Sequence, residues 1–441
     1  MKLSVIGLGK LGAPLAAVMA SKGFEVLGAD LRRDFVDSIN AGQAPVVEPR
    51  LQELIDASKG RLRATTDVEE AVRETDASFV IVPTPTGPDG IFLLDYVMAC
   101  AKPIGQAIAE KSSYHLVVIT STVMPGDTGT KLVPALEEAS GKRCGADFGV
   151  CYNPEFIALG SVVYNMLNPD FILVGESDAK AGAMLETIYR QSCDKPPHFA
   201  HMNFVNAELA KISVNSFVTM RISFANQLAR ICDFISGADV DVITSAIGLD
   251  TRIGRKYLKG AVSFGGPCFP RDNVAFAKMA AGLGTEAPMA LATDKMNNDY
   301  LDHLAAKILR LLPRGGVAGL LGMSYKPDTG VIDASPSVEL ARRLLKKSCQ
   351  VIAHDPLAIP EARAKLGEHI VWAATMNECA READVLIILV PWPEYAGLEP
   401  GMLKNGGKGV SVLDCWRQLP SEQFAGICHY ELIGCPNSAQ G

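Results

Sequence analysis

The stretch KLSVIGLGKLG, residues 2–12, decides the fold of the first half of this chain. A short apolar run of strand length leads directly into GLGKLG, which has the spacing G-x-G-x-x-G. In such a turn the first glycine permits a sharp bend, the second lets a pyrophosphate approach the backbone, and the third lets the next helix pack closely. The free amides at the start of that helix attract phosphate. The stretch therefore predicts a strand, a turn and a helix that together hold a dinucleotide.

An acidic residue, Asp30, ends the second apolar run, FEVLGAD. A carboxylate at this position accepts hydrogen bonds from ribose hydroxyls and repels a 2′-phosphate, so it favours NAD over NADP. Arg32 and Arg33 follow directly, and nearby arginines are what NADP sites use, so the alternative stays open. A glycine turn without any ligand is the other interpretation, and the strand context counts against it.

Short apolar runs alternate with helical stretches through the first two hundred residues. Strands that are apolar at every position are typical of a parallel sheet covered on both faces. Residues 206–236 contain neither Gly nor Pro, which predicts one long helix capped by Gly237. The pattern then resumes, and CQVIAHDP and EADVLIILVPWP echo FEVLGADL and TDASFVIVPTP. We therefore predict an α/β protein with two doubly wound Rossmann-like domains joined by a long central helix. The second copy lacks G-x-G-x-x-G, so any nucleotide it binds should differ from the first.

Composition bounds the partners of the chain. A net charge of −7 over 441 residues gives no support for nucleic-acid binding. The longest apolar runs, such as DVLIILVP, are of strand length, so we expect no membrane span. The amino terminus enters a strand at once without a signal sequence, which favours a cytoplasmic location. The eleven cysteines include no C-x-x-C pair, and no metal ligand set is apparent.

Lys211 and Asn215 are four residues apart on the long predicted helix, so their side chains share one face. Together an ammonium and an amide can hold an oxyanion or assist the oxidation of a hydroxyl. Such a pair is more often a solvated helix face. The apolar neighbours in AELAKISVNSF favour a buried helix, however, and a buried lysine needs an anion, a substrate or a lowered pKa.

The segment SFGGPCFPRD, residues 263–272, places Cys268 among glycines and prolines. A thiolate can trap an aldehyde as a thiohemiacetal, which is oxidised to a thioester and then hydrolysed. Asp272 lies one helical turn further on if a helix starts near Pro270, where it could act as a base or orient water. The spacing alone leaves open whether Cys268 is such a nucleophile or a buried core thiol.

With these residues assembled, the chain resembles the UDP-glucose/GDP-mannose dehydrogenase family over nearly its whole length. The motifs that carry the resemblance follow one another in order: GLGKLGAPLA, VEPRL, VPTP, TSTVMPG, YNPEF, ELAKISVNSF, RIGRKYLK, FGGPCFPRD and GLLGMSYKPDT. The resemblance implies oxidation of a nucleotide sugar at C6 to the uronic acid with two NAD.

The resemblance also implies roles for individual residues. The implied catalytic residues are Cys268, Lys211, Asn215, Asp272, Glu155 and Thr122. Cys268 is then the nucleophile with Asp272 as its partner carboxylate, while Thr122 and Glu155 position water and assist proton transfer. The implied cofactor contacts are Gly7, Leu8, Gly9, Lys10, Leu11, Gly12, Asp30, Pro83, Thr84, Pro85, Ser121, Thr122 and Glu155. The implied substrate contacts are Glu155, Phe156, Ile157, Lys211, Asn215, Arg252, Tyr257, Lys259, Phe264, Gly265, Tyr325 and Lys326.

Three domains follow from the resemblance: an NAD-binding domain at 1–200, a central helical domain at 201–300 that carries catalytic residues, and a nucleotide-sugar-binding domain at 301–441. We expect a homodimer through the central helix, or a higher homo-oligomer, with Arg252 reaching the neighbouring subunit. The expected ligands are NAD and a nucleotide sugar, with no nucleic acid and no membrane as partners.

Three positions depart from the family pattern. Leu159 stands where a second glutamate is common, and Asp333 stands where similar enzymes have an arginine at the cofactor. In DCWRQ the arginine that often contacts the sugar nucleotide is missing or displaced by Trp416 to Arg417. These departures bear on substrate and cofactor binding more than on the reaction class.

Several alternatives remain at this stage. RIGRKYLK and FGGPCFPRD favour UDP-glucose, SGKRCGADFGV and VEPRLQEL also resemble GDP-mannose enzymes, and other UDP-sugars such as the 2-acetamido sugars fit less well. A two-electron β-hydroxyacid dehydrogenase would also use a lysine and an asparagine on a helix, without needing Cys268. A nucleotide-sugar-binding protein that has lost catalysis is the third alternative.

Overall fold

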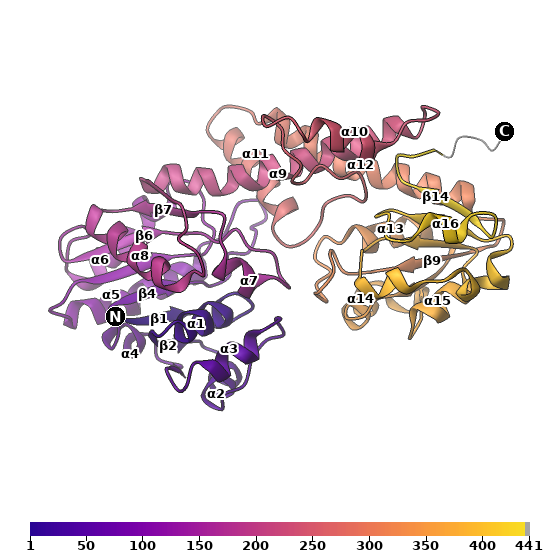
Figure 1. Ribbon diagram of the computed structural model, residues 1–441. Helices are drawn as coiled ribbons and strands as arrows, with labels where there is room; N and C mark the ends of the chain where they lie inside the picture. The colour runs from indigo at the N-terminus through magenta and orange to yellow at the C-terminus, as the bar shows by residue number, and fades with distance from the viewer. Residues whose placement is uncertain (437–441) are drawn as a thin grey trace. The chain divides into compact units, whose positions relative to one another are not determined.

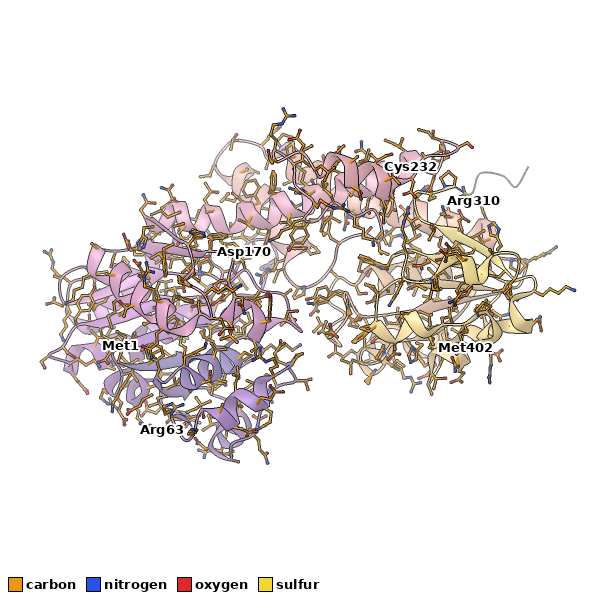
Figure 2. All side chains as sticks on the ribbon, viewed as in Figure 1. Met1, Arg63, Asp170, Cys232, Arg310 and Met402 are labelled. Carbon is orange, nitrogen blue, oxygen red and sulfur yellow. The ribbon has the colours of Figure 1, made fainter. Side chains whose placement is uncertain are left out.

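The computed structural model describes residues 1–436. The chain forms two compact units, Met1–Ser213 and Val214–Gly441, and each is described by itself. The boundary lies within the long helix α9, Phe204–Cys232. Figure 1 labels the elements, and Figure 2 shows the side chains that fill the space between sheets and helices.

The first unit is built on an eight-stranded sheet with the order β3-β2-β1-β4-β5-β6-β7-β8. Its strands are β1 (Lys2–Ile6), β2 (Glu25–Ala29), β3 (Leu62–Thr65), β4 (Ala77–Val80), β5 (His115–Ile119), β6 (Phe148–Tyr152), β7 (Ile172–Glu176) and β8 (Phe199–Met202). Neighbouring strands are parallel except at β6 and β7, which pair antiparallel. The expectation of a wholly parallel sheet is therefore wrong for its last two strands, because the chain after β6 enters β7 from the opposite edge.

Helices cover both faces of this sheet (Figure 1). They are α1 (Gly12–Ser21), α2 (Arg33–Asn40), α3 (Leu51–Ala57), α4 (Val68–Arg73), α5 (Asp95–Glu110), the π-helical turn η1 (Thr128–Leu132), α6 (Val133–Ser140), α7 (Val162–Leu167) and α8 (Ala179–Ser192). One core cluster joins the sheet to α1, α3, α7 and α8, and a second joins it to α4, α5 and α6. Strands β4, β5 and β6 are buried at every position, which explains their continuous apolar sequence.

The second unit holds a six-stranded parallel sheet with the order β11-β10-β9-β12-β13-β14. Its strands are β9 (Val317–Leu321), β10 (Gln350–His354), β11 (Val371–Trp372), β12 (Val385–Ile388), β13 (Ser411–Asp414) and β14 (His429–Leu432). Its helices are α13 (Pro336–Lys346), α14 (Ile359–Leu366), α15 (Met376–Glu382) and α16 (Ser421–Phe424), with 3-10 turns η2 (Gly367–His369), η3 (Pro393–Gly397), η4 (Pro400–Met402) and η5 (Lys404–Gly407). Apolar clusters on both sheet faces confirm the second Rossmann-like domain.

Between α9 and the second sheet lie α10 (Val240–Ile247), α11 (Phe269–Gly282) and α12 (Pro288–Leu311). The predicted long helix is present, but it ends at Cys232 and not at Ser236. The backbone tightens there into short turns in which Phe234 N bonds to Ile231 O at 3.1 Å. Asp233 at the end of the helix is held by His303 and Lys307, each at 2.9 Å.

Within residues 1–436, no helix combines the length and apolar character that a bilayer crossing needs.

Candidate active site

The glycine turn after β1 has the geometry that its sequence predicts. Gly7 adopts φ +98°, a backbone conformation that residues with a Cβ rarely adopt, and its N–H donates to Ala29 O at 2.8 Å. A Cβ on Gly12 would lie 1.7 Å from Gly7 O, whereas a Cβ on Gly9 would meet nothing within 4 Å. The first and third glycines therefore serve the fold, and the second leaves open space beside the backbone for a phosphate.

The carboxylate of Asp30 lies beside this turn. Its Oδ2 accepts from Leu8 N at 2.6 Å and its Oδ1 accepts from Arg32 N at 2.8 Å, while the residue stays partly exposed. The Arg32 guanidinium bonds to Asp34 and lies 3.8 Å from the centre of the Phe35 ring. Hydrogen bonding to Arg32 lowers the pKa of Asp34. Arg32 is thus paired within its own loop, which fits NAD better than NADP.

Loops after β4 and β5 complete this edge of the sheet. Ser121 Oγ accepts from Val82 N at 2.9 Å and donates to Val82 O at 2.7 Å, so it fixes the start of the Pro83-Thr84-Pro85 loop. Thr84 is buried, and Thr122 follows Ser121 with part of its surface exposed. The predicted cofactor residues after β1, β2, β4 and β5 therefore all lie at the carboxyl edge of the sheet, where α/β proteins bind ligands.

Glu155 lies in the loop after β6. Its Oε1 is 3.3 Å from Tyr189 Oη, which donates a shorter bond of 2.6 Å to Asn153 Oδ1. Part of the residue is accessible, but its carboxyl group is enclosed. Burial raises the pKa of Glu155 to about 7, against the opposing effects of the Tyr189 hydrogen bond and the Lys211 charge. A carboxyl group that titrates near neutrality can both give and take a proton.

Lys211 on α9 points at the same loop. Its Nζ donates to the backbone carbonyl of Glu155 at 2.5 Å and lies 4.5 Å from the centre of the Phe156 ring. The side chain is buried, as its apolar neighbours predict. Ile157 and Leu159 are partly buried and pack against the core cluster, so Leu159 makes an apolar contact where the family commonly has a polar group.

Sequence reasoning missed two supports of this loop. Glu48 Oε2 accepts from Gly160 N at 2.9 Å and its Oε1 accepts from Val162 N at 2.7 Å, which fastens the far end of the loop. Tyr189 comes from α8, and no local pattern links it to Glu155. Glu48 lies in the VEPRL motif, so the sequence marked this position as a family motif but did not indicate what the side chain does.

In the second unit, Cys268 is the N-cap residue of α11, which begins at Phe269 as predicted for a helix start near Pro270. The residue is exposed, whereas Cys151 and Cys415 are buried and burial raises the pKa of their thiols. A helix amino terminus stabilises a negative charge such as a thiolate. The core-thiol interpretation therefore fails for Cys268 on exposure alone.

Asp272 lies one turn behind Cys268 and is 1% exposed. Its Oδ2 accepts from Asn215 Nδ2 at 2.6 Å, its Oδ1 accepts from Arg271 Nε at 3.2 Å, and its N–H bonds to Cys268 O at 2.8 Å. Helix α9 and helix α11 thus meet through Asn215 and Asp272. The sequence predicted each of these two residues as a site residue, and the hydrogen bond between them is a finding of the structure.

The two glycines before Cys268 bring this loop against the loop after β9. A Cβ on Gly265 would lie 2.3 Å from Ala334 O, and a Cβ on Gly266 would lie 2.6 Å from the Tyr325 ring. Gly266 N donates to Asp333 O at 2.9 Å. Asp333 itself is exposed and contributes its backbone, so its side chain is not needed for this contact.

Phe264 begins this loop, and Asn297 of α12 bonds to both its N–H and its carbonyl at 2.9 Å. Phe269, the first residue of α11, lies edge-on to both Phe264 and Tyr257, with ring centres 6.5 and 6.4 Å apart. Lys326 is partly exposed beside Tyr325. The Cys268 loop is therefore held from two sides by packing and hydrogen bonds.

Arg252 and Lys259 each pair with an acidic residue outside this loop. Arg252 is exposed and pairs with Asp250 at 2.5 Å, and Lys259 lies 4.0 Å from Asp241. Arg417 pairs with Asp239 at 2.8 Å and with Asp241 at 3.4 Å, so it ties the second sheet to α10. Burial raises the pKa of Asp239, but the Arg417 contact outweighs this effect and the net pKa is lowered.

Trp416, the residue before Arg417, donates from Nε1 to Leu389 O at 2.8 Å. Both residues of this departure are therefore committed to contacts within the second unit. Residues 1–436 hold no cluster of three His, Cys, Asp or Glu side chains that could bind a metal.

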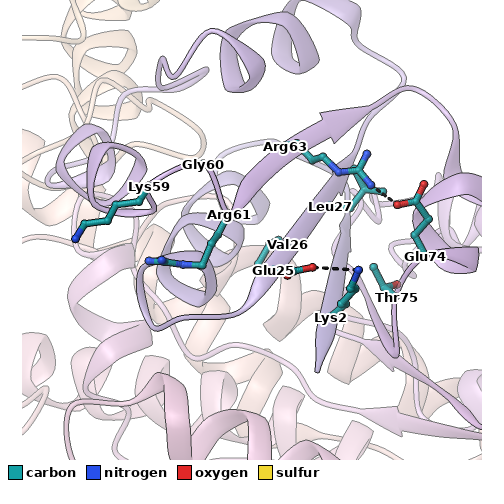
Figure 3. A pocket seen from close by; sticks show the side chains of 10 residues that line it. All are labelled: Lys2, Glu25, Val26, Leu27, Lys59, Gly60, Arg61, Arg63, Glu74 and Thr75. Atoms are coloured by element: carbon teal, nitrogen blue, oxygen red, sulfur yellow. Dashed lines mark hydrogen bonds and ion pairs between the residues drawn. The ribbon is translucent and has the colours of Figure 1, made fainter.

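One hollow in the first unit lies away from all these residues. It is lined by Lys2, Glu25, Lys59, Arg61, Arg63 and Glu74 with their neighbours (Figure 3). Lys2 pairs with Glu25 at 3.1 Å and Arg63 pairs with Glu74. It opens at the amino ends of β1 and β2, opposite the edge that carries Gly7 and Asp30, so it is not the dinucleotide site.

Comparisons with known proteins agree with this geometry. Residues 1–193 match the NAD binding domain of the UDP-glucose/GDP-mannose dehydrogenase family, 205–299 its central domain and 319–421 its UDP binding domain. A UDP-glucose 6-dehydrogenase of Haloferax volcanii is 35% identical over 90% of this chain and 93% of its own length. A GDP-mannose 6-dehydrogenase of Pseudomonas aeruginosa is 35% identical over 80% of this chain and 81% of its own.

The solved structure of a UDP-glucose dehydrogenase from Pyrobaculum islandicum covers 98% of both chains at 35% identity with a TM-score of 0.87. The resemblance, the fold class and the use of NAD that the sequence predicts are confirmed by these matches. The chain therefore belongs to the UDP-glucose/GDP-mannose dehydrogenase family and is an NAD-dependent oxidoreductase.

Proposed function

We propose that this protein oxidises UDP-glucose at C6 to UDP-glucuronate through a covalent intermediate on Cys268. The observation that carries the proposal is the setting of Cys268: an exposed thiol at the amino terminus of α11, with buried Asp272 one turn behind it and Asn215 bonded to Asp272. A helix amino terminus stabilises a thiolate, and a fixed carboxylate nearby can act as a base.

NAD supplies the hydride acceptor, and the Gly7 turn fits it, because Gly9 leaves open space and Asp30 stands at the rim. After the first hydride leaves C6, the sulfur of Cys268 bonds to the aldehyde carbon and the oxygen carries the negative charge. A second hydride leaves the same carbon, for which a second NAD would be the acceptor, and a thioester remains. Water then adds to the carbonyl, the C–S bond breaks and the thiol is restored.

The polar groups around Cys268 and Glu155 have separate tasks in this proposal. Lys211 and Asn215 stabilise negative charge on the substrate oxygen as it develops. Glu155 exchanges protons with the substrate oxygen or with water, for which a pKa of about 7 suits it. Thr122 orients that water, and Asp272 fixes Asn215 and the first turn of α11.

UDP-glucose is the proposed substrate because RIGRKYLK and FGGPCFPRD favour it and because the UDP-glucose dehydrogenase structure of Pyrobaculum islandicum matches 98% of this chain at 35% identity with a TM-score of 0.87. Tyr325, Lys326 and the segment 252–266 are the proposed contacts to the nucleotide sugar. GDP-mannose is the alternative, since enzymes that carry that name match at similar identity.

A panel of UDP-glucose, GDP-mannose and UDP-N-acetylhexosamines, followed by NADH absorbance, tests the substrate. We expect two NADH per UDP-glucose and acid formation that Cys268→Ser abolishes while UDP-glucose binding by calorimetry persists. One NADH per substrate, unaffected by Cys268→Ala, would show a two-electron dehydrogenase. Binding of a UDP-sugar without NADH from any member of the panel would show a binding protein.

We also propose that the protein is a homodimer formed through α9. Phe217, Phe224 and Ile231 are spaced by seven residues, so they form one stripe along the helix, and each is more than 40% exposed. Val242 and Leu249 of the neighbouring segment are exposed as well. Sedimentation velocity should show a dimer, and Phe224→Glu should shift it to monomer without changing the circular dichroism spectrum. An unchanged dimer in that variant would exclude this surface. A cytoplasmic location and the expected reach of Arg252 to a neighbouring subunit stay predictions.

A further inference from the structure

The segment that leads to the Cys268 turn, residues 261–266, is buried throughout but forms no strand. Buried backbone N–H and C=O groups need hydrogen-bond partners, and this segment cannot obtain them from a neighbouring strand. Side chains of two helices supply them. Ala261 N donates to Asn226 Oδ1 of α9 at 3.0 Å, and Asn226 Nδ2 donates to Val262 O at 3.1 Å. Tyr300 Oη of α12 donates to Ala261 O at 3.1 Å.

Asn297 of α12 takes the place of a strand partner for the end of this segment. It is 8% exposed. Phe264 N donates to Asn297 Oδ1, and Asn297 Nδ2 donates to Phe264 O, both at 2.9 Å. Paired residues of an antiparallel sheet exchange two bonds in the same way. The backbone carbonyl of Asn297 also accepts from Ser263 Oγ at 2.7 Å. Asn297 therefore holds both residues that precede the glycine pair.

The same helix holds the chain on the far side of the thiol. Asn273 of α11 donates from Nδ2 to Ala290 O of α12 at 2.8 Å. Ala290 and Asn297 are seven residues apart, which is about two helical turns, so they lie on one side of α12. The Phe264 ring in turn lies edge-on to the ring of Phe269 with their centres 6.5 Å apart. Helix α12 thus contacts the chain before and after the thiol.

These contacts bear on the chemistry of Cys268. The free amides at the start of α11 stabilise a thiolate only while the sulfur stays beside them. Because Cys268 is the N-cap residue, its place depends on the path of the chain that enters the helix. That path is fixed at Phe264 by Asn297 and at Gly266 by a bond of 2.9 Å to Asp333 O. The Asn297 bonds to Phe264 come from a side chain, so a substitution can remove them.

We propose that Asn297 is a positioning residue for Cys268: from α12 it fixes Phe264 and thereby keeps the thiol beside the free amides of α11, where its thiolate is stabilised. The value of this thiolate for turnover rests on the proposed function, because only there does Cys268 attack an aldehyde. The reactivity of the thiol is a property of the folded protein and is measurable without substrate.

The rate constant for alkylation of Cys268 by iodoacetamide near neutral pH tests the proposal. Each variant is compared with the same variant carrying Cys268→Ser, which gives the background from the other cysteines. In Asn297→Ala the sulfur is no longer held beside the amides, so less thiolate is present and the rate constant should fall about tenfold. The midpoint of the pH profile of alkylation should rise with it. An unchanged or higher rate constant, as general loosening would give, overturns the proposal.

Asn226→Ala is the matched control. Asn226 is also buried and also bonds one N–H and one carbonyl of the segment, but at Ala261 and Val262, further along the chain from the thiol. This variant should leave the alkylation rate constant of Cys268 unchanged. An equal fall in both variants would show that the segment as a whole sets the reactivity, and that result also overturns the role of Asn297.

Ser263→Ala serves as a milder variant should Asn297→Ala not fold. It removes only the bond to the Asn297 carbonyl, so the rate constant should change in the same direction by a smaller factor. A rise or no change would contradict the proposal. With UDP-glucose, kcat for acid formation should fall in Asn297→Ala together with alkylation. If the wild type oxidises no nucleotide sugar, the proposed function fails, while the alkylation rates still decide the role of Asn297.

Discussion

The turn after the first strand has nearly the same backbone geometry in both sheets, but the two turns serve different purposes. Gly7 after β1 has φ +98° and Gly322 after β9 has φ +99°. Each donates its N–H at 2.8 Å to the neighbouring strand, Gly7 to Ala29 O and Gly322 to His354 O. The duplication that the sequence echoes predict therefore extends to the conformation of single residues.

Each edge also places a carboxylate at the end of its second strand. Asp30 accepts from Leu8 N at 2.6 Å, and Asp355 accepts from Met323 N at 2.7 Å. Asp30 stays partly exposed, whereas Asp355 is 2% exposed. The further donors to Asp355 are Ser324 N and Oγ, Leu357 N, Ala358 N and Trp392 Nε1.

This difference shows that the same arrangement of strand, turn and carboxylate can either bind a ligand or stabilise the fold through internal hydrogen bonds. Around Asp355 the protein itself supplies the hydrogen-bond donors that ribose hydroxyls would offer to Asp30. The second sheet is thus built without a dinucleotide subsite at this edge, and a different nucleotide there stays our prediction.

Asp355→Asn should give the largest effect. The amide would turn a donor toward the backbone N–H groups that now bond to a buried carboxylate, at a cost of about 3 kcal/mol or more in unfolding free energy. Urea titration of the whole chain measures this loss. A midpoint equal to that of the wild type would mean that the two carboxylates are alike after all.

Glu155→Gln contrasts a second buried carboxyl with Asp355. Because the pKa of folded Glu155 is raised to about 7 from 4.5, the folded state holds a proton that the unfolded state loses, and stability falls as pH rises through that window. Glu155→Gln removes this titration. The unfolding free energy of the variant relative to the wild type should therefore be higher at pH 8 than at pH 4.5, by up to about 3 kcal/mol. Melting temperatures of both proteins across this range measure it, and parallel curves would contradict the expectation.

Asp30→Asn should have little effect on stability and a clear one on the cofactor. Loss of a charged acceptor for the ribose should raise the KM for NAD about tenfold, equivalent to roughly 1.4 kcal/mol, with a smaller change in kcat. Asp355→Asn in mild conditions, where it stays folded, serves as the control with an unchanged KM for NAD. Equal changes of the KM for NAD in both variants would contradict the expectation that Asp30 contacts the cofactor and Asp355 does not.

Arg32→Ala should give the smallest effect. Arg32 and Asp34 form an exposed pair, and such pairs contribute little to stability, so the melting temperature should not change measurably. The preference for NAD over NADP should persist as well. A loss of NADP turnover in this variant would show that Arg32 leaves Asp34 to bind a 2′-phosphate.

The sequence predicted those features that depend on local pattern. The glycine turn, the two sheets, the long helix and the start of α11 just after Cys268 each follow from residue spacing within one segment. The reversal of β7 and β8 was missed because an apolar run has the same pattern in either direction. The early end of α9 was missed. Asp233, directly after the helix, pairs with Lys307, and no local pattern reveals a partner so far away in the sequence.

The candidate site shows the same division. Cys268, Asp272, Lys211 and Asn215 lie in motifs, and the structure confirms that Lys211 is buried. The bond between Asn215 and Asp272 was not predicted, because it joins two helices far apart in the sequence. Tyr189 acts on Glu155 from another helix, so no motif could reveal it. The catalytic roles of all these residues stay predictions until variants are measured.

The close approach of Gly265 and Gly266 to Ala334 and Tyr325 has a consequence for engineering. The shape of the loop before Cys268 depends on its contacts with the segment that follows β9. The central segment and the second sheet therefore have to match each other in sequence. Exchanging the sheet between relatives to change sugar preference should therefore carry residues 263–336 along, because a junction inside that range would pair one relative's glycines with another's loop.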